Sequence, residues 1–264
     1  KTIPLLAILR KNLLDNKNTR IVYTGKSPDF IDIQTLNRVY GYTFELKNIE
    51  DKEEIPAFNG STVFISQHDG FCNFEISPNV DFFIHTHAHL GSVLFVNGEQ
   101  NEHYISEIQH VRRRETIAMT PANCLTALKE ITTKSSFSQV SNFEADKKCV
   151  LDSIKEITGA TTNALVASSG LSIQYAILMG LIHDALENHK GKAIKIIVPP
   201  NCYGGTNDQA RRIAACIDLV EVLDLPVDGG KYMVQSVEIV LEKIAHEDAI
   251  PYIIAEIPTN PRVE

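Results

Sequence analysis

Three turns in the second half of the chain carry residues whose types and spacing could do chemistry. The first reads Ser168-Ser169-Gly170-Leu171, and its small residues let the backbone come close to a ligand. Free amide N–H groups at a helix start, together with the helix dipole, can bind a phosphate. The same four residues are equally typical of an ordinary helix cap, so this turn alone leaves both interpretations open.

The two other turns carry an aromatic ring and a side-chain amide. Residues 199–206 read PPNCYGGT, so Tyr203 stands on a Gly-Gly turn and could lay its ring over a flat ligand. Residues 256–261 read EIPTNP, and two prolines fix the backbone beside Asn260, whose amide can both donate and accept hydrogen bonds. Each turn also has a structural interpretation: a loop tyrosine packed on a neighbour, and an asparagine that forms a turn.

Hydrophobic periodicity predicts that these turns lie at one edge of a sheet. Strands are predicted at residues 164–167, 194–198, 219–223 and 252–256. Helices are predicted at residues 145–158, 171–189, 208–217 and 234–246. This alternation predicts an α/β fold with a mainly parallel sheet covered on both faces. Ligands of such sheets bind at the carboxyl ends of the strands, which is where all three turns are expected.

The order of the three motifs resembles a known enzyme family. SSG after one strand, YGGT after the next and E-x-P-T-N-P after the fourth resemble the pyridoxal-phosphate enzymes of Cys/Met metabolism, such as cystathionine γ-synthase and methionine γ-lyase. The resemblance covers residues 135–264 and implies an incomplete aspartate-aminotransferase-like large domain of fold type I. It also implies a homodimer or homotetramer that uses pyridoxal 5′-phosphate as cofactor. The implied activity is that of a lyase or transferase, by β or γ elimination or replacement on sulfur-containing or related amino acids.

The resemblance implies a role for each matching residue. The backbone amides of Gly170 and Leu171 would hold the cofactor phosphate, and Tyr203 would stack on the pyridine ring and assist proton transfer. Asn260 would donate a hydrogen bond to the phenolic oxygen, and Glu256 would lie beside the site. The implied cofactor-binding residues are therefore Ser169, Gly170, Leu171, Tyr203, Glu256 and Asn260.

Two departures from the family pattern bear on these roles. The family carries Y-S-R-x-x-N ahead of the long helix, but residues 137–142 read FSQVSN, so Phe137 and Gln139 lack the hydroxyl and the charge that hold the phosphate. The run Arg112 to Arg114 could replace them, or it could belong to a solvated face or form local ion pairs. The family's Schiff-base lysine follows the P-T-N-P turn, so we expect it beyond Glu264. The alternatives are that a second chain supplies it, or that the domain is catalytically silent.

Residues 1–130 are expected to form a separate α+β segment, and residues 131–264 the first part of the large domain. Strands are predicted at residues 20–24, 61–66 and 81–96. Within the last of these, His85, His87 and His89 alternate and would share one strand face, where they could bind zinc with His68 and Asp69. The alternative is the polar face of an amphipathic strand. The rival function is therefore a catalytically silent binding or assembly protein with a metal on this strand.

Composition limits the classes of partner. The 264 residues are 44% hydrophobic and 22% charged, and the formal net charge is −8. An acidic chain is a poor match for nucleic acid or an anionic membrane, but the charge does not argue against a small anionic ligand held by a local site. The small-molecule amino-acid substrate is what the family resemblance implies. The five scattered cysteines fit a reducing cytoplasm, mostly as small buried residues. The most apolar window, residues 164–182, contains several polar residues and predicts a strand, a turn and a helix rather than a membrane span.

Overall fold

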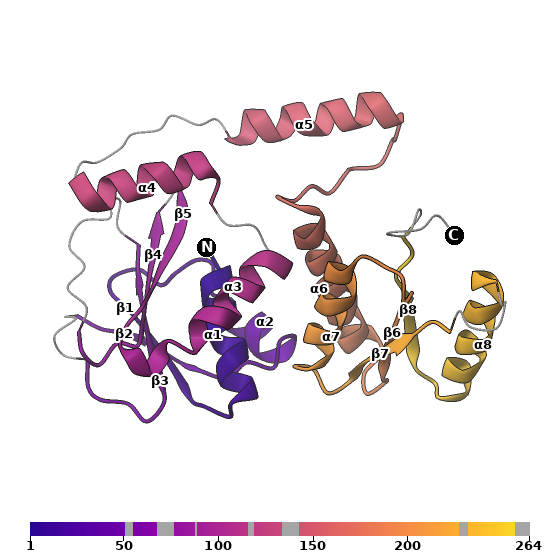
Figure 1. Ribbon diagram of the computed structural model, residues 1–264, viewed down its shortest axis with the longest axis horizontal. Coiled ribbons are helices and arrows are strands. Elements are labelled where there is room, and N and C mark those ends of the chain that lie inside the picture. Colours follow the sequence, from indigo (N-terminus) through magenta and orange to yellow (C-terminus); the bar gives the residue numbers. More distant parts are fainter. Residues whose placement is uncertain are drawn as a thin grey trace. The chain divides into compact units, whose positions relative to one another are not determined.

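The computed structural model describes residues 1–50, 55–67, 77–87, 89–115, 119–133, 143–226 and 232–256, in two compact units (Figure 1). Unit 1 comprises Lys1–Asp32 and Thr43–Ser169, and unit 2 comprises Ile33–Tyr42 and Gly170–Glu264. Each unit combines helices with its own sheet, so the predicted α/β class is confirmed. The predicted division between residues 130 and 131 remains a prediction.

Unit 1 is built on a five-stranded sheet with the order β2-β1-β3-β4-β5. The strands are β1 (Thr19–Tyr23), β2 (Glu45–Asn48), β3 (Ser61–Ser66), β4 (Phe82–His87) and β5 (Gly91–Val96). Strands β1 to β4 are parallel, and β5 runs antiparallel to β4. The run predicted as one strand over residues 81–96 is therefore two strands that fold back on each other. The second of them, β5, is an edge strand.

Both faces of this sheet contribute to the core of unit 1. The helices of the unit are α1 (Ile3–Leu14), α3 (Tyr104–Arg114), α4 (Pro121–Thr133), α5 (Phe143–Thr158) and the 3-10 turn η2 (Glu99–Asn101). On one face the ring of Phe82 contacts that of Tyr104 edge to face, with centroids 4.7 Å apart. On the other face Phe64 and Phe83 stack at 5.3 Å beside Val22. Because strand side chains alternate, the two layers are built by neighbouring residues of the same strands.

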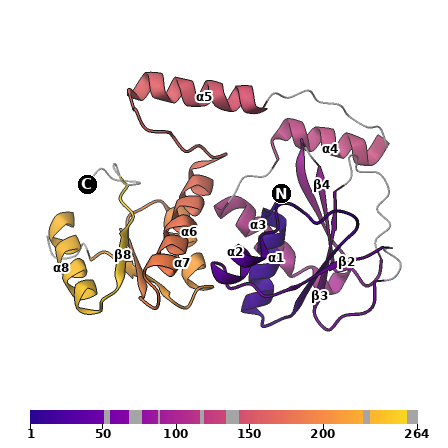
Figure 2. The same cartoon turned by 180° about the vertical axis from the view of Figure 1, so that it is seen from behind.

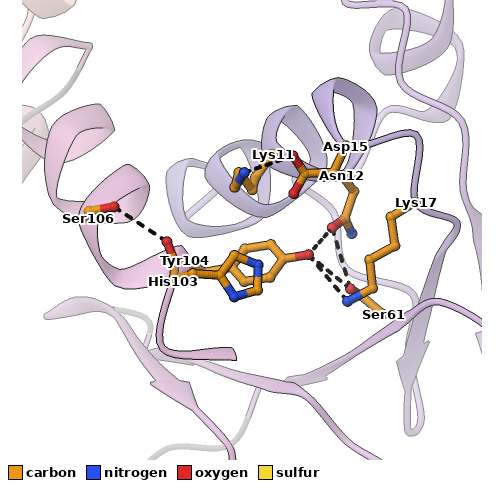
Figure 3. A network of polar contacts seen from close by, with 8 residues as sticks. All are labelled: Lys11, Asn12, Asp15, Lys17, Ser61, His103, Tyr104 and Ser106. Atoms are coloured by element: carbon orange, nitrogen blue, oxygen red, sulfur yellow. Dashed lines mark hydrogen bonds and ion pairs between the residues drawn. The ribbon is translucent and has the colours of Figure 1, made fainter. Parts of the chain in front are cut away.

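A buried polar network ties α1 and α3 to the start of the sheet (Figure 3). The Tyr104 hydroxyl donates to Asn12 Oδ1, and Asn12 Nδ2 donates to Thr19 Oγ1 at 2.7 Å. Ser61 Oγ lies 3.4 Å from both the Tyr104 hydroxyl and Asn12 Oδ1, and Lys17 Nζ lies 3.4 Å from that hydroxyl. Buried polar groups need such partners because an unsatisfied one is costly. The network therefore fixes the packing of both helices at the amino ends of β1 and β3.

Unit 2 contains a three-stranded parallel sheet with helices on both faces (Figure 2). Its strands are β6 (Ile194–Val198), β7 (Val220–Asp224) and β8 (Ile250–Ile253), in the order β7-β6-β8. Its helices are α2 (Ile33–Arg38), α6 (Gly170–Asn188), α7 (Gly204–Ala214) and α8 (Met233–His246). The central strand β6 reads IKIIV because both of its faces are covered. Ile196 packs on the side of α6 and α7, and Ile197 packs on the side of α8.

One strand predicted for this half of the chain is absent. Residues 164–167 are irregular, and Leu165 is 79% exposed. A strand needs a paired neighbour, and within the described residues the sheet of unit 2 contains only β6, β7 and β8. The other strands and helices predicted from residue 145 onward are confirmed, with ends that differ by a few residues. Within the described part of the chain, no helix has the length and apolarity needed to cross a membrane.

Candidate active site in unit 2

The carboxyl edge of the unit 2 sheet brings together two of the three predicted turns. Strand β6 ends at Val198 and leads to Tyr203, the N-cap residue of α7, while β8 ends at Ile253 and leads to Glu256. Because β6 and β8 are parallel neighbours, their carboxyl ends lie at the same edge of the sheet. The candidate site is built at this edge.

Glu256 joins the two turns through both carboxylate oxygens. The backbone N–H of Tyr203 donates to Glu256 Oε2 at 2.7 Å, and the hydroxyl of Thr206 donates to Oε1 at 2.6 Å. A carboxylate at a helix N-terminus is favourable because it satisfies free N–H groups and faces the positive end of the helix dipole. Glu256 therefore holds the first turn of α7 against the end of β8. The sequence did not identify these two partners of Glu256, and its role beside a cofactor remains a prediction.

A glutamine of α6 extends this arrangement. Gln174 Oε1 is placed 3.2 Å from Thr206 Oγ1, and Gln174 Nε2 is buried with no hydrogen-bond partner among the described residues. A hydroxyl has one proton, and that of Thr206 goes to Glu256. Flipping the Gln174 side-chain amide exchanges its oxygen and nitrogen, so that Nε2 donates to Thr206 Oγ1 while the Thr206 hydroxyl donates to Glu256. A hydrogen-bonded chain then runs from Gln174 through Thr206 to Glu256.

The start of α6 meets the same turn. Gln209 is fully buried in α7, and its Nε2 donates to the backbone oxygen of Leu171 at 2.9 Å. A Cβ atom on Gly205 would lie 2.5 Å from Cε1 of Tyr203 and 3.0 Å from Cδ1 of Leu171. Only glycine fits at this position without displacing one of these side chains. Leu171 and Tyr203 therefore both approach Gly205, which brings the first turn of α6 beside the tyrosine ring.

The resulting surface fits a flat phosphorylated molecule. A Cβ on Gly170 would meet no atom within 4 Å, so the N-terminus of α6 can be approached closely by a ligand. The amide N–H groups of that helix start are anion donors, and Ser169 immediately precedes it. The Tyr203 ring is 45% exposed and can stack on an aromatic ligand. The residues present therefore suit the phosphate and the ring of pyridoxal phosphate.

Several predicted residues cannot be placed in this site. Asn260 lies outside the described residues, as do Phe137 and Gln139. Arg112 to Arg114 form the last turn of α3 in unit 1, where Arg112 Nε donates to Gln109 Oε1 at 2.9 Å. The exposure of Arg112 and Arg113 agrees with a solvated helix face. The partners Gln174, Thr206 and Gln209 were missed because their role depends on residues 30 or more positions away.

The histidine run does not form the predicted shared face. His85 and His87 are buried on β4, but the strand ends at His87, and His89 is exposed beyond it. His87 Nδ1 accepts hydrogen bonds from the backbone N–H groups of His89 and Leu90 at 3.1 and 3.2 Å, so it stabilises the connection to β5. Searched over the described ranges alone, the chain contains no group of three potential metal ligands. His68 and Asp69 lie outside those ranges.

Comparison of the chain with protein-family models, with curated proteins and with solved structures finds no match in any of the three.

The buried thiol beside the site gives a first prediction. Burial raises the pKa of Cys202, and the nearby carboxylate of Glu256 raises it further. Because the thiolate is the reactive form, we expect Cys202 to be alkylated by iodoacetamide at least tenfold more slowly at pH 8 than the exposed Cys149. The rate for Cys202 should keep rising above pH 9. Mass spectrometry of both peptides over time measures this ratio, and equal rates at pH 8 would contradict the burial of Cys202.

Proposed function

We propose that unit 2 belongs to the large domain of a pyridoxal-phosphate-dependent lyase or transferase with the aspartate-aminotransferase-like fold. Its substrates are sulfur-containing or related amino acids, and the reaction is elimination or replacement at the β or γ carbon. The proposal combines the resemblance to the Cys/Met metabolism enzymes with the site at the carboxyl edge of the sheet. In this proposal the active form is a homodimer or homotetramer.

One observation carries the proposal: two segments that are distant in the sequence, the start of α6 and the end of β8, meet at the turn on which Tyr203 stands. Leu171 of α6 and the ring of Tyr203 both approach Gly205, and Glu256 at the end of β8 accepts a hydrogen bond from the Tyr203 backbone. An ordinary helix cap would require none of these long-range contacts. Helix-start amides beside an exposed aromatic ring are the two features that a phosphorylated pyridine needs.

Each residue of the site has a distinct task in this proposal. The cofactor, when bound, stabilises negative charge at the α carbon of an amino acid. The amides of Gly170 and Leu171 bind its phosphate, and the Tyr203 ring stacks on its pyridine. In this proposal the Tyr203 hydroxyl holds or moves a proton. Glu256 is a positioning residue, since both of its oxygens are engaged in holding the turn on which Tyr203 stands.

The test measures binding of pyridoxine 5′-phosphate by isothermal titration calorimetry. This probe carries the ring and the phosphate but has no aldehyde, so it cannot attach to surface lysines. Tyr203→Ala should weaken binding at least tenfold, because stacking on an aromatic side chain contributes about 1–3 kcal/mol. Tyr232 is the matched control: it is also the N-cap residue of a helix that follows a strand, and it is 77% exposed.

Tyr232→Ala should bind the probe like the unchanged protein. Pyridoxine without phosphate should bind much more weakly, since it cannot use the helix-start amides. The proposal fails if the unchanged protein does not bind the probe at millimolar concentration, or if both tyrosine variants lose binding equally. The first outcome would favour the catalytically silent binding or assembly protein.

A further inference from the structure

Unit 1 contains a cavity of about 560 Å³ whose lining includes Ser168, at the start of the 168–171 turn, but none of the residues proposed to bind the cofactor. Leu90, which precedes β5, and the first four residues of the strand, Gly91 to Leu94, line it consecutively. Because β5 is the edge strand of its sheet, no sixth strand of the described sheet occupies this position. The start of α1 and the middle of α3 contribute Ala7 and Ile108, and the start of α4 contributes Cys124.

The lining of this cavity is mainly apolar. Leu90, Val93 and Met119 belong to one small hydrophobic cluster, and Ile3, Leu94 and Ile108 add further aliphatic groups. The volume falls in the range of about 300–1,000 Å³ that is usual for small-molecule sites. Apolar walls of this extent suit a hydrocarbon chain, which is taken out of water when it binds.

The charged residues of the lining have one sign. Of the described residues around the cavity, none is acidic, while Lys1 and Arg112 are basic. This contrasts with the whole chain, whose net charge is −8. Arg112 is one of the residues that line the cavity, and its Nε donates to Gln109 Oε1 at 2.9 Å. A guanidinium is the side chain best suited to bind a carboxylate through paired hydrogen bonds.

We propose that this cavity binds a free, single-chain amphipathic carboxylate. The hydrocarbon chain lies against the apolar side chains of Val93, Ile108 and Met119, and the carboxylate pairs with Arg112. Charge complementarity and the apolar walls together select this class over an uncharged lipid. The site is independent of the proposed function of unit 2, because every residue it uses belongs to unit 1.

Calorimetric titration with dodecanoate tests the head-group contact. Arg112→Gln should raise the dissociation constant at least tenfold, because it replaces a charged hydrogen-bond donor by a neutral one. Arg113→Gln is the matched control, since Arg113 is exposed on the same helical turn and does not line the cavity. Dodecanol should bind the unchanged protein at least tenfold more weakly than dodecanoate.

Protection of the Cys124 thiol from alkylation tests where dodecanoate binds, and it requires no substitution. Saturating dodecanoate should slow the alkylation of Cys124 by N-ethylmaleimide at least fivefold, because Cys124 lines the cavity. Alkylation of Cys149, which is exposed on α5, should be unchanged. The proposal is overturned if Cys124 is not protected, if Arg112→Gln and Arg113→Gln bind dodecanoate equally, or if dodecanol binds as tightly. If an extended peptide protects Cys124 and dodecanoate does not, the cavity instead binds a peptide that pairs with β5 as an additional strand.

Discussion

Replacing Glu115 with alanine should lower the free energy of unfolding of unit 1 by about 3–5 kcal/mol. Arg10 of α1 donates to Glu115, which follows α3, and these residues are only 3% and 2% exposed. Removing the carboxylate leaves a guanidinium buried without its main counter-charge. Glu107 lies 3.8 Å from Arg10 Nη1 and compensates for part of the loss, which favours the lower end of this range.

Urea unfolding followed by hydrogen exchange in β3 measures this effect within unit 1. Asp15→Ala is the control, because it removes the exposed pair with Lys11 and should cost less than about 1 kcal/mol. The double variant Arg10→Met with Glu115→Leu should recover most of the stability, since neither buried charge is left alone. A loss below about 1 kcal/mol for Glu115→Ala would show that the pair is not buried.

The second large effect is expected in unit 2, where Ile196→Ala should cost about 2–5 kcal/mol. Ile196 is fully buried at the centre of β6, with Val222 and Tyr252 beside it on the neighbouring strands. Its side chain packs in the cluster that contains Leu178 and Ile182 of α6. The shorter side chain buries less apolar surface and leaves a cavity. Because β6 is hydrogen-bonded to a strand on each side, its backbone cannot move to fill that cavity.

Hydrogen exchange in β6 and β8 reports the loss locally. The conservative variant Ile196→Val should cost about 0.5–1.5 kcal/mol, because it removes a single methyl group. Val234→Ala on α8 is the control at an exposed position. Val234 is 68% exposed, so this substitution should hardly change the free energy of unfolding. Equal small losses for Ile196→Ala and Val234→Ala would mean that β6 is not the centre of the packed sheet.

Local sequence patterns correctly predicted the helices and strands that keep the same pattern of burial along their whole length. Strand β6 agrees with its predicted bounds because a strand covered on both faces needs a continuous apolar run. Helix α6 agrees to within a residue at each end, since a small-residue turn precedes it. The turn containing Tyr203 was predicted as a site because a tyrosine on a Gly-Gly turn after a parallel strand could lie over a flat ligand, and the structure explains Gly205 by the side chains that approach it.

Other features depended on partners distant in the sequence. Residues 164–167 have the composition of a strand, yet no strand of the described sheet pairs with them. His85 and His87 alternate along β4 as predicted. The strand ends at His87, so His89 does not share their strand face. Helix α1 lacks a strong apolar stripe in sequence because it is buried along much of its surface, and periodicity therefore did not reveal it.

The sequence by itself determined the α/β class, the positions of most elements after residue 145 and the turn on which Tyr203 stands. These follow from interactions between residues a few positions apart, which hydrophobic periods and turn residues record directly. Only the tertiary structure decided that Glu256 holds that turn, that Gln174 reaches Thr206, and that β5 leaves a cavity at a sheet edge. Those features arise when chain segments tens of residues apart meet, and a linear pattern contains no measure of which segments will do so.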